Sequence, residues 1–310
     1  MRAGVLALAL LCACAFHAHA ARRIWIDTDP AIGAPWREVD DAFALLLALN
    51  SPEVAIVGIS TTYGNASLRR TTEVARAFVR RSAKQIGIYP GARSSAELAK
   101  RSEATNALAQ AVRTQRLTYV ALGPLTNLAA FLNAHPALAD EIEQLIFVGG
   151  RAPEHQLSFG RSGWLRLHDA NVVKDPEAVR RVLRSGIPIT LAPAQVSGRL
   201  VLNRADVARI GQSGDAGAFL RRKSGVWLWF WTTVLRERGG PVFDALAVIA
   251  CIQPRLIEVE ERFAEITAGG DLLVKRGPPR GATRVRCCTS FAPQTQQFLE
   301  QRLAKAAPVR

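Results

Sequence analysis

Short, continuous apolar runs alternate with longer amphipathic stretches along this chain, and that alternation restricts the fold more than any other feature. The apolar runs predict buried strands at residues 23–27, 54–61, 119–122, 145–148 and 188–191. Between them, apolar residues recur at helical spacing, which predicts helices at 39–49, 71–81, 125–133 and 175–183. Strands that are apolar along their whole length are covered on both faces. The repeated strand-then-helix order therefore predicts an α/β fold, Rossmann-like and doubly wound, with a mostly parallel sheet and helices on both faces.

The N-terminus has the pattern of a secretory signal peptide. Arg2 supplies a positive charge, residues 5–16 form an apolar segment, and residues 18–20 (AHA) place small side chains where a signal peptidase cleaves. We expect cleavage after Ala20, a secreted or periplasmic protein, and a single domain over residues 21–310. A permanent membrane anchor is the weaker alternative, because the apolar segment is too short to span a bilayer.

The chain carries a formal net charge of +14 at pH 7. A strongly basic protein raises the question of a nucleic-acid partner. The basic residues are scattered, often in pairs such as Arg69-Arg70 and Arg221-Arg222, and no long basic run is interleaved with aromatic residues. We therefore expect a basic, solvated surface and no nucleic-acid partner; a binder of nucleic acid or another polyanion is the weaker alternative. The apolar stretch 226–234 is too short to span a membrane and fits a buried or pocket-lining helix.

Cysteine usage does not indicate a disulfide scaffold. Cys12 and Cys14 fall within the predicted signal, where they loosely resemble a lipoprotein attachment site, a weaker alternative to simple cleavage. Cys251, Cys287 and Cys288 remain. Adjacent cysteines rarely pair with each other, so the sequence leaves open one bridge from Cys251 or a set of buried thiols.

Acidic and amide residues follow the predicted strands at the point where those strands end. Asp27 and Asp29 close the first strand, Asp40 and Asp41 open the next helix, and Asn65 follows the second strand. The carboxyl ends of parallel strands meet at one edge of a sheet, where ligands bind. Carboxylates gathered there repel one another unless they share a cation, and hard oxygen ligands select Ca²⁺ or Mg²⁺ over Zn²⁺. The alternative for Asp40 and Asp41 is simple capping of a helix N-terminus.

These residues and several later motifs resemble the inosine–uridine nucleoside hydrolase family along nearly all of the chain after residue 20. Seven motifs match in order: 27–30 (DTDP) with 39–42 (VDDA), 62–65 (TYGN), 89–92 (YPGA), 121–129 (ALGPLTNLA), 147–150 (FVGG), 169–178 (DANVVKDPEA) and 243–248 (FDALAV). Any one of them is weak, but seven in the right order are specific. The resemblance implies an enzyme that hydrolyses N-glycosyl bonds, of the EC 3.2.2 type, with a ribonucleoside as its small-molecule substrate. Family members are often dimers or tetramers, which suggests a homo-oligomer by analogy alone.

The resemblance also implies roles for individual residues. Four would hold Ca²⁺: Asp29, Asp41, Thr126 through its backbone carbonyl, and Asp244. Four would bind the ribose: Asp40, Asn65, Asp169 and Asn171. Asp29 would also be the catalytic base that takes a proton from the metal-bound water, and Asp27 would support the cluster from behind. The expected reaction is direct attack of that water on the N-ribosidic bond, with inversion and an oxocarbenium-like transition state.

Four departures from the family pattern bear on the substrate. Residues 32–38 look like an insertion before the second aspartate pair, and Trp36 within it is a candidate pocket residue. Phe243 stands where many purine-cleaving members have a histidine that protonates the leaving base. Asp169 is one methylene shorter than the usual glutamate, and an asparagine expected near 160–163 is absent. The metal site is therefore the firmer prediction, whereas the base preference and the leaving-group acid stay open.

The missing histidine and asparagine keep two alternatives open. One is a non-catalytic periplasmic binder of nucleosides or related sugars, and the other is a hydrolase of a different N-glycoside. His168, beside the predicted ribose-binding Asp169, is a further candidate for substrate contact. Trp227, Trp229 and Trp231 alternate along a helical stretch, so they cannot share one face, and core packing is their expected role.

Overall fold

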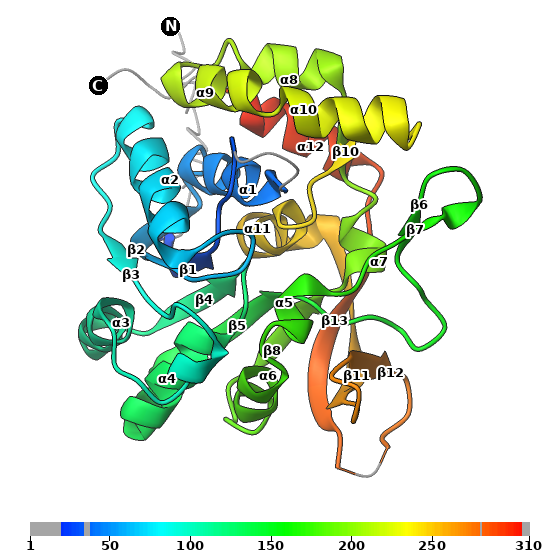
Figure 1. The fold of residues 1–310 in the computed structure, drawn as a ribbon. Coiled ribbons are helices and arrows are strands. Elements are labelled where there is room, and N and C mark those ends of the chain that lie inside the picture. The colour runs from blue at the N-terminus through cyan, green and yellow to red at the C-terminus, as the bar shows by residue number, and fades with distance from the viewer. Residues whose placement is uncertain (1–19, 34–37, 280, 306–310) are drawn as a thin grey trace, which may run out of the picture.

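A nine-stranded sheet forms the centre of the structure, a computed structural model that describes residues 20–33, 38–279 and 281–305. The order across the sheet is β12-β11-β13-β8-β5-β4-β1-β2-β3 (Figure 1). The strand bounds are β1 Arg22–Thr28, β2 Val54–Thr61, β3 Ile88–Pro90, β4 Leu117–Ala121, β5 Ile142–Val148, β8 Ile189–Ala192, β11 Ile257–Ile266, β12 Leu272–Lys275 and β13 Thr283–Phe291. The predicted signal, apart from Ala20, lies outside the described residues.

From β3 across to β13, each strand runs parallel to the next one in the sheet. β1 lies inside this parallel part, between β2 and β4, and its side chains alternate between the two faces of the sheet. Ile24 and Ile26 belong to the apolar core on one face, whereas Trp25 belongs to the core on the other. The predicted doubly covered parallel sheet is therefore confirmed.

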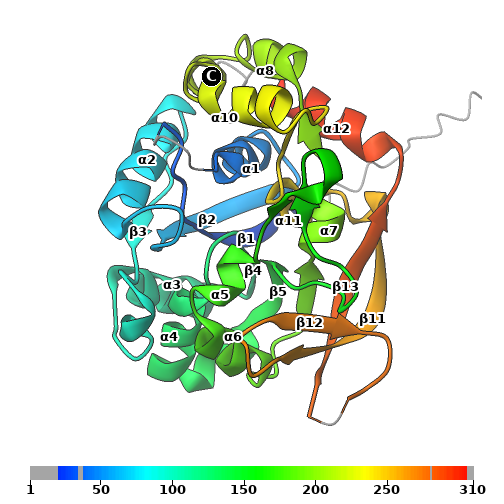
Figure 2. The same cartoon turned by 45° about the vertical axis from the view of Figure 1, so that its right-hand side comes forward.

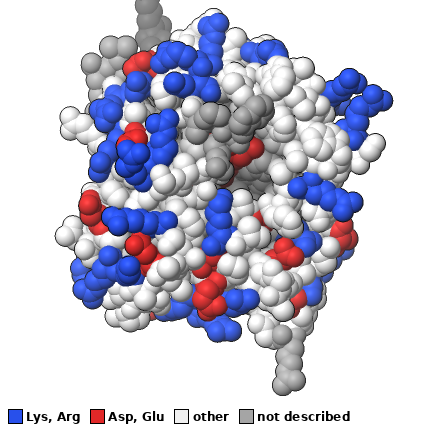
Figure 3. All heavy atoms as spheres, in the orientation of Figure 1, with Lys and Arg blue, Asp and Glu red and all other residues white. Residues whose placement is uncertain are grey.

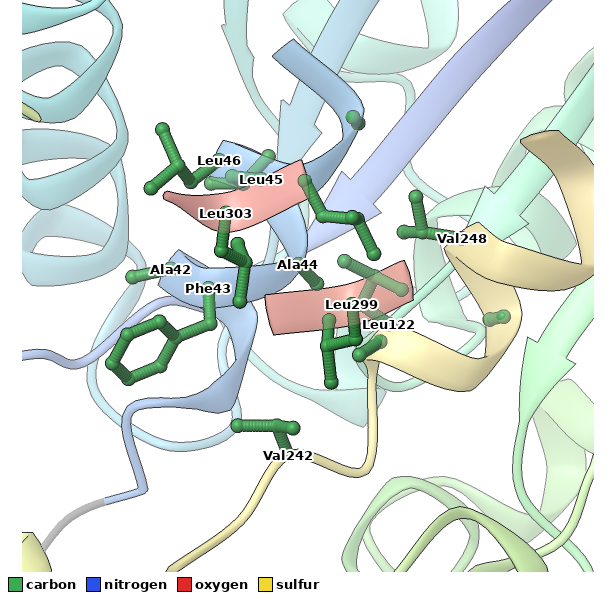
Figure 4. Packing of buried hydrophobic residues seen from close by; sticks show 14 of the residues in the cluster. Ala42, Phe43, Ala44, Leu45, Leu46, Leu122, Val242, Val248, Leu299 and Leu303 are labelled. Atoms are coloured by element: carbon green, nitrogen blue, oxygen red, sulfur yellow. The ribbon is translucent and has the colours of Figure 1, made fainter. Parts of the chain in front are cut away.

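Helices cover both faces of the sheet, as Figures 1 and 2 show. One face carries α1 Asp40–Leu49, α2 Leu68–Arg81, α11 Ala245–Ile252 and α12 Gln294–Leu303. The opposite face carries α3 Glu103–Thr114, α4 Thr126–Ala134 and α6 Pro176–Leu183. α1 and α11 are buried along their whole length, and Leu303 of α12 lies beside Leu45 and Leu46 of α1 (Figure 4), while Leu299 belongs to the same core cluster. This packing holds the acidic start of α1 rigidly at the edge of the sheet.

The C-terminal edge of the sheet is antiparallel. β11 pairs antiparallel with both β13 and β12. These three strands were not predicted, because charged and apolar side chains mix along β11 and β13 without a sustained period and β12 has only four residues. The antiparallel edge leaves the parallel part intact, so the fold class predicted from the sequence stands.

The remaining elements lie over the sheet edge or connect the main layers. They are α5 Ala170–Val173, α7 Ala194–Ser197, α8 Arg204–Ile210, α9 Asp215–Lys223, α10 Gly225–Trp229, the π-helix η4 Phe230–Val234, β6 Ser158–Phe159, β7 Leu165–Arg166, β9 Val201–Leu202, β10 Gly240–Pro241, and the 3₁₀ helices η1 Ser95–Glu97, η2 Pro136–Glu141, η3 Arg161–Gly163 and η5 Pro254–Leu256. Trp227 and Trp231 are buried, whereas Trp229 is 43% exposed. The prediction that the three tryptophans do not share a face is confirmed.

Two further expectations can be checked against the described residues. Cys251, Cys287 and Cys288 are free, buried thiols, so the bridge that the sequence left open is not formed. Within the described part of the chain, no helix has the length and apolar character needed to cross a membrane.

Candidate active site

The polar residues expected to act together come from segments that end at one edge of the sheet. Asp29 follows the last residue of β1, Asn65 follows β2 after a short turn, and Thr126 begins α4 shortly after β4. Asp40 and Asp41 begin α1, and Asp244 is the residue before α11. The strands are parallel, so their carboxyl ends bring these distant segments to one place.

Asp41 is held in one orientation by three donors. Its Oδ1 accepts hydrogen bonds from Thr28 Oγ1 at 2.5 Å and from the backbone N–H of Asp29 at 3.0 Å. Its Oδ2 accepts one from Asn65 Nδ2 at 3.1 Å. The carboxylate is fully buried. Asp41 thus joins the end of β1, the turn after β2 and the start of α1 into one unit.

The carboxylate of Asp29 lies in a tight, buried cradle. Its Oδ2 accepts a hydrogen bond of 2.5 Å from the backbone N–H of Asn65. Among the described residues, its Oδ1 has no hydrogen-bond partner, although the atom is buried. Two glycines make room for this carboxylate: a Cβ added to Gly64 would lie 1.8 Å from Oδ2, and one added to Gly123 would lie 2.8 Å from Oδ1. A buried acceptor without a partner is costly, so a missing ligand is the natural explanation.

Three carboxylates offer oxygens close enough to share one cation. Ligand atoms of Asp40, Asp41 and Asp244 lie within 4.8 Å of one another, and all three residues are buried. Asp29 is not in this trio, but its backbone contacts Asp41 directly. Burial raises the pKa of Asp40 well above its usual value, and the charge of Asp41 raises it further. Burial likewise raises the pKa of Asp244, followed by the effect of Asp40.

Burial also raises the pKa of Asp29 well above its ordinary value, and the neighbouring Asp41 adds to the rise. The charge of Lys174 acts in the opposite direction on both Asp29 and Asp41. Buried carboxylates in such mutual repulsion become compatible when a divalent cation lies among them. Their all-oxygen donor set suits Ca²⁺ or Mg²⁺ rather than Zn²⁺. The residues present therefore fit a hard divalent cation.

Thr126 and Asp27 lie beside this cluster in different ways. Thr126 is fully buried, and its hydroxyl donates a hydrogen bond of 2.6 Å to Asp175. Asp27 lies behind the cluster, where its Oδ1 accepts hydrogen bonds from Ser60 at 2.6 Å and Asn127 at 2.7 Å. Burial raises the pKa of Asp27 to about 6. The supporting role of Asp27 stays a prediction, and the hydrogen bond from Thr126 adds Asp175, which was not singled out from the sequence.

A cavity of about 110 Å³ opens beside the carboxylates. The four residues expected to bind ribose all line it: Asp40, Asn65, Asp169 and Asn171. Asp244, Phe243 and His168 line it as well, so His168 is placed where it can contact a ligand. In the space-filling view, acidic atoms lie inside a hollow, while Lys and Arg side chains are spread over the surrounding face (Figure 3).

Asp169 and Asn171 are oriented by the backbone around the cavity. Asp169 caps α5: its Oδ1 accepts from the backbone N–H of Val172 at 3.3 Å, and its Oδ2 accepts from Gly150 at 2.6 Å. Burial raises the pKa of Asp169 to about 6. Asn171 donates both hydrogens of its amide nitrogen to the carbonyls of Leu122, at 2.8 Å, and Val148, at 3.0 Å. The amide oxygen of Asn171 is then the atom left to accept a bond from a ligand.

The wall of the cavity contains a residue that the sequence analysis did not identify. Glu38, the last residue of the presumed insertion, lines the cavity beside Asp40. The indole Nε1 of Trp227 in α10 donates a hydrogen bond of 3.0 Å to Glu38 Oε2. Burial raises the pKa of Glu38 to about 7, and the charge of Asp41 contributes. The only sequence signal was an acid two positions before the aspartate pair; the proposed pocket residue Trp36 lies outside the described residues.

Phe243 forms an apolar part of the same wall. Its ring lies 6.2 Å from that of Phe159, edge to face, and Phe159 in turn lies 4.8 Å from Trp231 in the same manner. Such edge-to-face aromatic pairs fix ring positions. Phe243 therefore supplies a fixed aromatic surface and no proton donor at the position where the sequence lacks histidine.

Residues 24–299 match the family model described as inosine-uridine preferring nucleoside hydrolase. A pyrimidine-specific ribonucleoside hydrolase RihA of Enterobacter sp. (strain 638) is 27% identical over 267 residues, covering 74% of this chain and 81% of that protein. A pyrimidine-specific ribonucleoside hydrolase RihB of Escherichia coli O139:H28 is 24% identical over 290 residues, covering 84% and 86%.

Solved structures of similar proteins share the fold. A plant nucleoside hydrolase, PpNRh1, superposes with a TM-score of 0.77 at 22% identity, covering 92% of this chain and 99% of that one. A purine-preferring ribonucleoside hydrolase from Gardnerella vaginalis superposes with a TM-score of 0.76 at 21% identity, covering 91% and 98%. These similar proteins include both pyrimidine-specific and purine-preferring enzymes, so they do not indicate a base preference for this chain.

Proposed function

This chain belongs to the inosine-uridine preferring nucleoside hydrolase family, an enzyme family that hydrolyses the N-glycosyl bond of ribonucleosides, and we propose that it does so with Ca²⁺ bound and with inversion. The observation that carries the proposal is the carboxylate of Asp29. It is buried at the sheet edge, its Oδ1 has no partner among the described residues, and it lies beside the clustered acids of α1. A buried carboxylate oxygen that no described protein group satisfies is available to interact with a bound ligand.

The cation would be held by Asp29, Asp41, Asp244 and the backbone carbonyl of Thr126. When bound, it supplies Lewis acidity for the attacking water and a fixed partner for ribose hydroxyls. The close approach of Asp40, Asp41 and Asp244 oxygens, within 4.8 Å, supports a shared ion at this place. Asp40 belongs to that trio and also lines the cavity, so its carboxylate would lie next to the cation and could contact the sugar as well.

The ribose would be bound by residues that are already oriented. Asp40 and Asn65 line the cavity on the side of the aspartate cluster, and Asp169 and Asn171 come from the segment that follows β5. Asn65 Nδ2 donates to Asp41, which leaves the amide oxygen of Asn65 to accept from a sugar hydroxyl. Fixed acceptors of this kind hold the reacting carbon in place before the reaction begins.

Asp29 would accept a proton from the water as that water attacks the sugar carbon. The bond between this carbon and the base breaks through a transition state in which positive charge develops on the ribosyl ring. The surrounding carboxylates stabilise that charge more than they stabilise the neutral sugar, which is the condition for lowering the barrier. Direct attack, without a carboxylate bonded to the sugar, inverts the configuration.

We propose further that residues 1–20 are a signal peptide, that residues 21–310 form the mature domain, and that the enzyme acts in the periplasm or outside the cell. The sequence pattern at residues 18–20 supports cleavage after Ala20. N-terminal sequencing of the exported protein tests the proposal. A first residue at Ala21 is expected, and an intact N-terminus on exported protein would contradict it.

Ribose release over a panel of nucleosides tests the hydrolytic proposal. The protein is stripped with a chelator and assayed with inosine, guanosine, adenosine, uridine and cytidine, with and without added Ca²⁺. We expect Ca²⁺-dependent ribose release from at least one nucleoside, and loss of that release in Asp29→Ala. Tight nucleoside binding without any ribose release would instead identify a non-catalytic binder. The Asp140→Asn variant, an exposed acid in η2, is the matched control.

A further inference from the structure

We infer that the substrate of this site is a ribonucleoside whose base carries a fixed positive charge, such as an N-alkylated purine or a pyridinium ring. The inference rests on the proposed function, since it names the class of base that the same site cleaves. Two features of the cavity carry it: the charge of its walls, and the absence of a proton donor at residue 243.

The charge of the cavity is opposite to that of the whole chain. Glu38, Asp40, Asp169 and Asp244 line it, and the described lining includes neither Lys nor Arg, although the chain carries a formal net charge of +14. Asp29 and Asp41 lie directly behind these residues. One divalent cation offsets two of these carboxylates, and a positive charge bound beside the others favours their ionised form, so the walls are acidic when the site is filled. An acidic cavity favours a cationic ligand over a neutral one of the same shape.

Glu38 is the acid that distinguishes this cavity, because neither the proposed cation set nor the proposed ribose contacts require it. The hydrogen bond of 3.0 Å from Trp227 occupies its Oε2, and no described residue donates a hydrogen bond to its Oε1, which can therefore face a ligand. Trp227 is itself fixed, since it is buried and its ring lies 5.9 Å from that of Phe43. A carboxylate held in this way interacts with a ligand charge without first having to be ordered.

Phe243 favours the same class of substrate, a nucleoside with a cationic base, because of the chemistry of the leaving group. A neutral base needs a proton as it leaves, and the phenyl ring of Phe243 provides none, so that proton would have to come from His168 or Glu38 elsewhere in the lining. A cationic base needs no proton: the carbon–nitrogen bond breaks, its electron pair moves to the ring nitrogen and cancels the positive charge, and the base leaves as a neutral molecule. The water oxygen bonds to the sugar carbon, and one proton passes to Asp29 and then to solvent. An aromatic ring beside the base also favours a cation.

Paired substrates that differ by one N-methyl group and the positive charge it brings test this inference. Values of kcat/KM for inosine and N7-methylinosine are measured with wild type, Glu38→Gln and the control Glu154→Gln, which removes an acid that is 72% exposed. N7-methylation also raises intrinsic reactivity, so the readout is the change in the preference ratio between variants. Glu38→Gln removes one close charge pair, that between the carboxylate and the cationic base. We expect it to lower the ratio by about tenfold, mainly through the KM of N7-methylinosine. Glu154→Gln should leave the ratio unchanged.

A binding measurement separates recognition from turnover. The Ca²⁺-loaded protein is titrated with N1-methylnicotinamide, a cation, and with nicotinamide, which is neutral. We expect wild type to bind the cation more tightly and Glu38→Gln to lose that difference while keeping the wild-type melting temperature.

The outcomes distinguish the inference from the function on which it rests. Asp29-dependent hydrolysis of neutral nucleosides, with a ratio that Glu38→Gln does not change, would overturn the inference and leave the proposed function standing. If neither the neutral nor the cationic nucleosides released ribose, the proposed function would be wrong. Equal binding of the two nicotinamide probes would overturn the preference for a cation, whatever the hydrolysis assay shows.

Discussion

The indole N–H of Trp227 donates a hydrogen bond of 3.0 Å to Glu38 Oε2, and it thereby joins α10 to the segment before α1. The two residues are 189 positions apart in the chain. Because Glu38 lines the cavity and Trp227 is buried, a helix that makes none of the proposed cation or ribose contacts fixes one acidic wall of the site.

Removing this hydrogen bond should weaken substrate binding. In Trp227→Phe, Glu38 loses the donor that lowers its pKa, which burial raises to about 7, so a smaller share of it is charged at neutral pH. A hydrogen bond to a charged group contributes about 1.5–3 kcal/mol. We expect kcat/KM to fall by about tenfold, mostly through KM, with kcat nearly unchanged. Steady-state kinetics of Trp227→Phe against Trp229→Phe, a tryptophan of the same helix that is 43% exposed, make the comparison. Equal effects of the two substitutions would contradict the role of the hydrogen bond.

The glycine beside Asp29 should be intolerant of any side chain. A Cβ at residue 64 would lie 1.8 Å from Asp29 Oδ2, so Gly64→Ala must displace the carboxylate that we propose as the base. Misplacement of a catalytic group by about 1 Å can lower the rate by about 10²-fold, and we expect at least that loss in kcat. Gly277→Ala is the control, since a Cβ there meets nothing within 4 Å. Gly64→Ala with wild-type kcat would show that Asp29 is not in its reactive position.

Asp27 should make the metal-free protein less stable as the pH rises. Its pKa is raised from 3.8 to about 6, chiefly by burial, so the folded state favours the protonated carboxyl. The resulting stabilisation is complete below pH 3.8 and is lost as the pH rises through about 6. Relative to Asp27→Asn, wild type should lose on the order of 3 kcal/mol of unfolding free energy between pH 4 and pH 7.

Urea unfolding of both proteins in chelator, at a series of pH values, measures this difference. Asp140→Asn, at an exposed position, controls for the general effect of removing an acid. A constant difference between wild type and Asp27→Asn over this pH range would mean that the carboxyl of Asp27 is not perturbed by burial.

Removing the cation should also lower thermal stability at neutral pH. A cation that binds only the folded state reduces the repulsion between the buried carboxylates and so stabilises that state. At a Ca²⁺ concentration of 100 times Kd, the gain is about 2.7 kcal/mol, or about 5 °C in Tm for a chain of this size. Asp244→Asn should lose most of this gain, whereas Asp271→Asn, an acid that forms an ion pair with Arg151 away from the cluster, should keep it. A Tm of wild type that does not respond to Ca²⁺ would argue against the site.

Much of the fold was predictable because buried parallel strands give a strong local signal. The apolar runs that became β1, β2, β4, β5 and β8 contain almost no competing pattern, and their helices follow at short range. β11 and β13 gave no such signal: their exposed faces carry many charged residues, and their pairing depends on contacts with strands far apart in the sequence. The antiparallel edge was therefore not predicted.

The site was predictable where its residues are fixed by strand ends, and not where they depend on tertiary contacts. Asp29, Asp40, Asp41 and Asn65 follow directly from the positions of β1, α1 and β2. Glu38 becomes a site residue only because Trp227, from a distant helix, holds it beside the cavity. Asp175 likewise takes its place through a hydrogen bond from Thr126. Asp175 and Thr126 lie in the matched motifs 169–178 and 121–129, but neither motif shows that the two residues meet, and Glu38 lies in no motif.

The central claim is that the carboxylate of Asp29 takes the proton from the attacking water, and kcat of Asp29→Asn at saturating Ca²⁺ and saturating nucleoside tests it most directly. The amide keeps the shape of the side chain but cannot act as a base. We predict a fall in kcat of about 10²–10⁴-fold, the usual contribution of a general base, in a protein that unfolds at the wild-type temperature. A folded variant that retains more than about a tenth of the wild-type kcat would contradict the account.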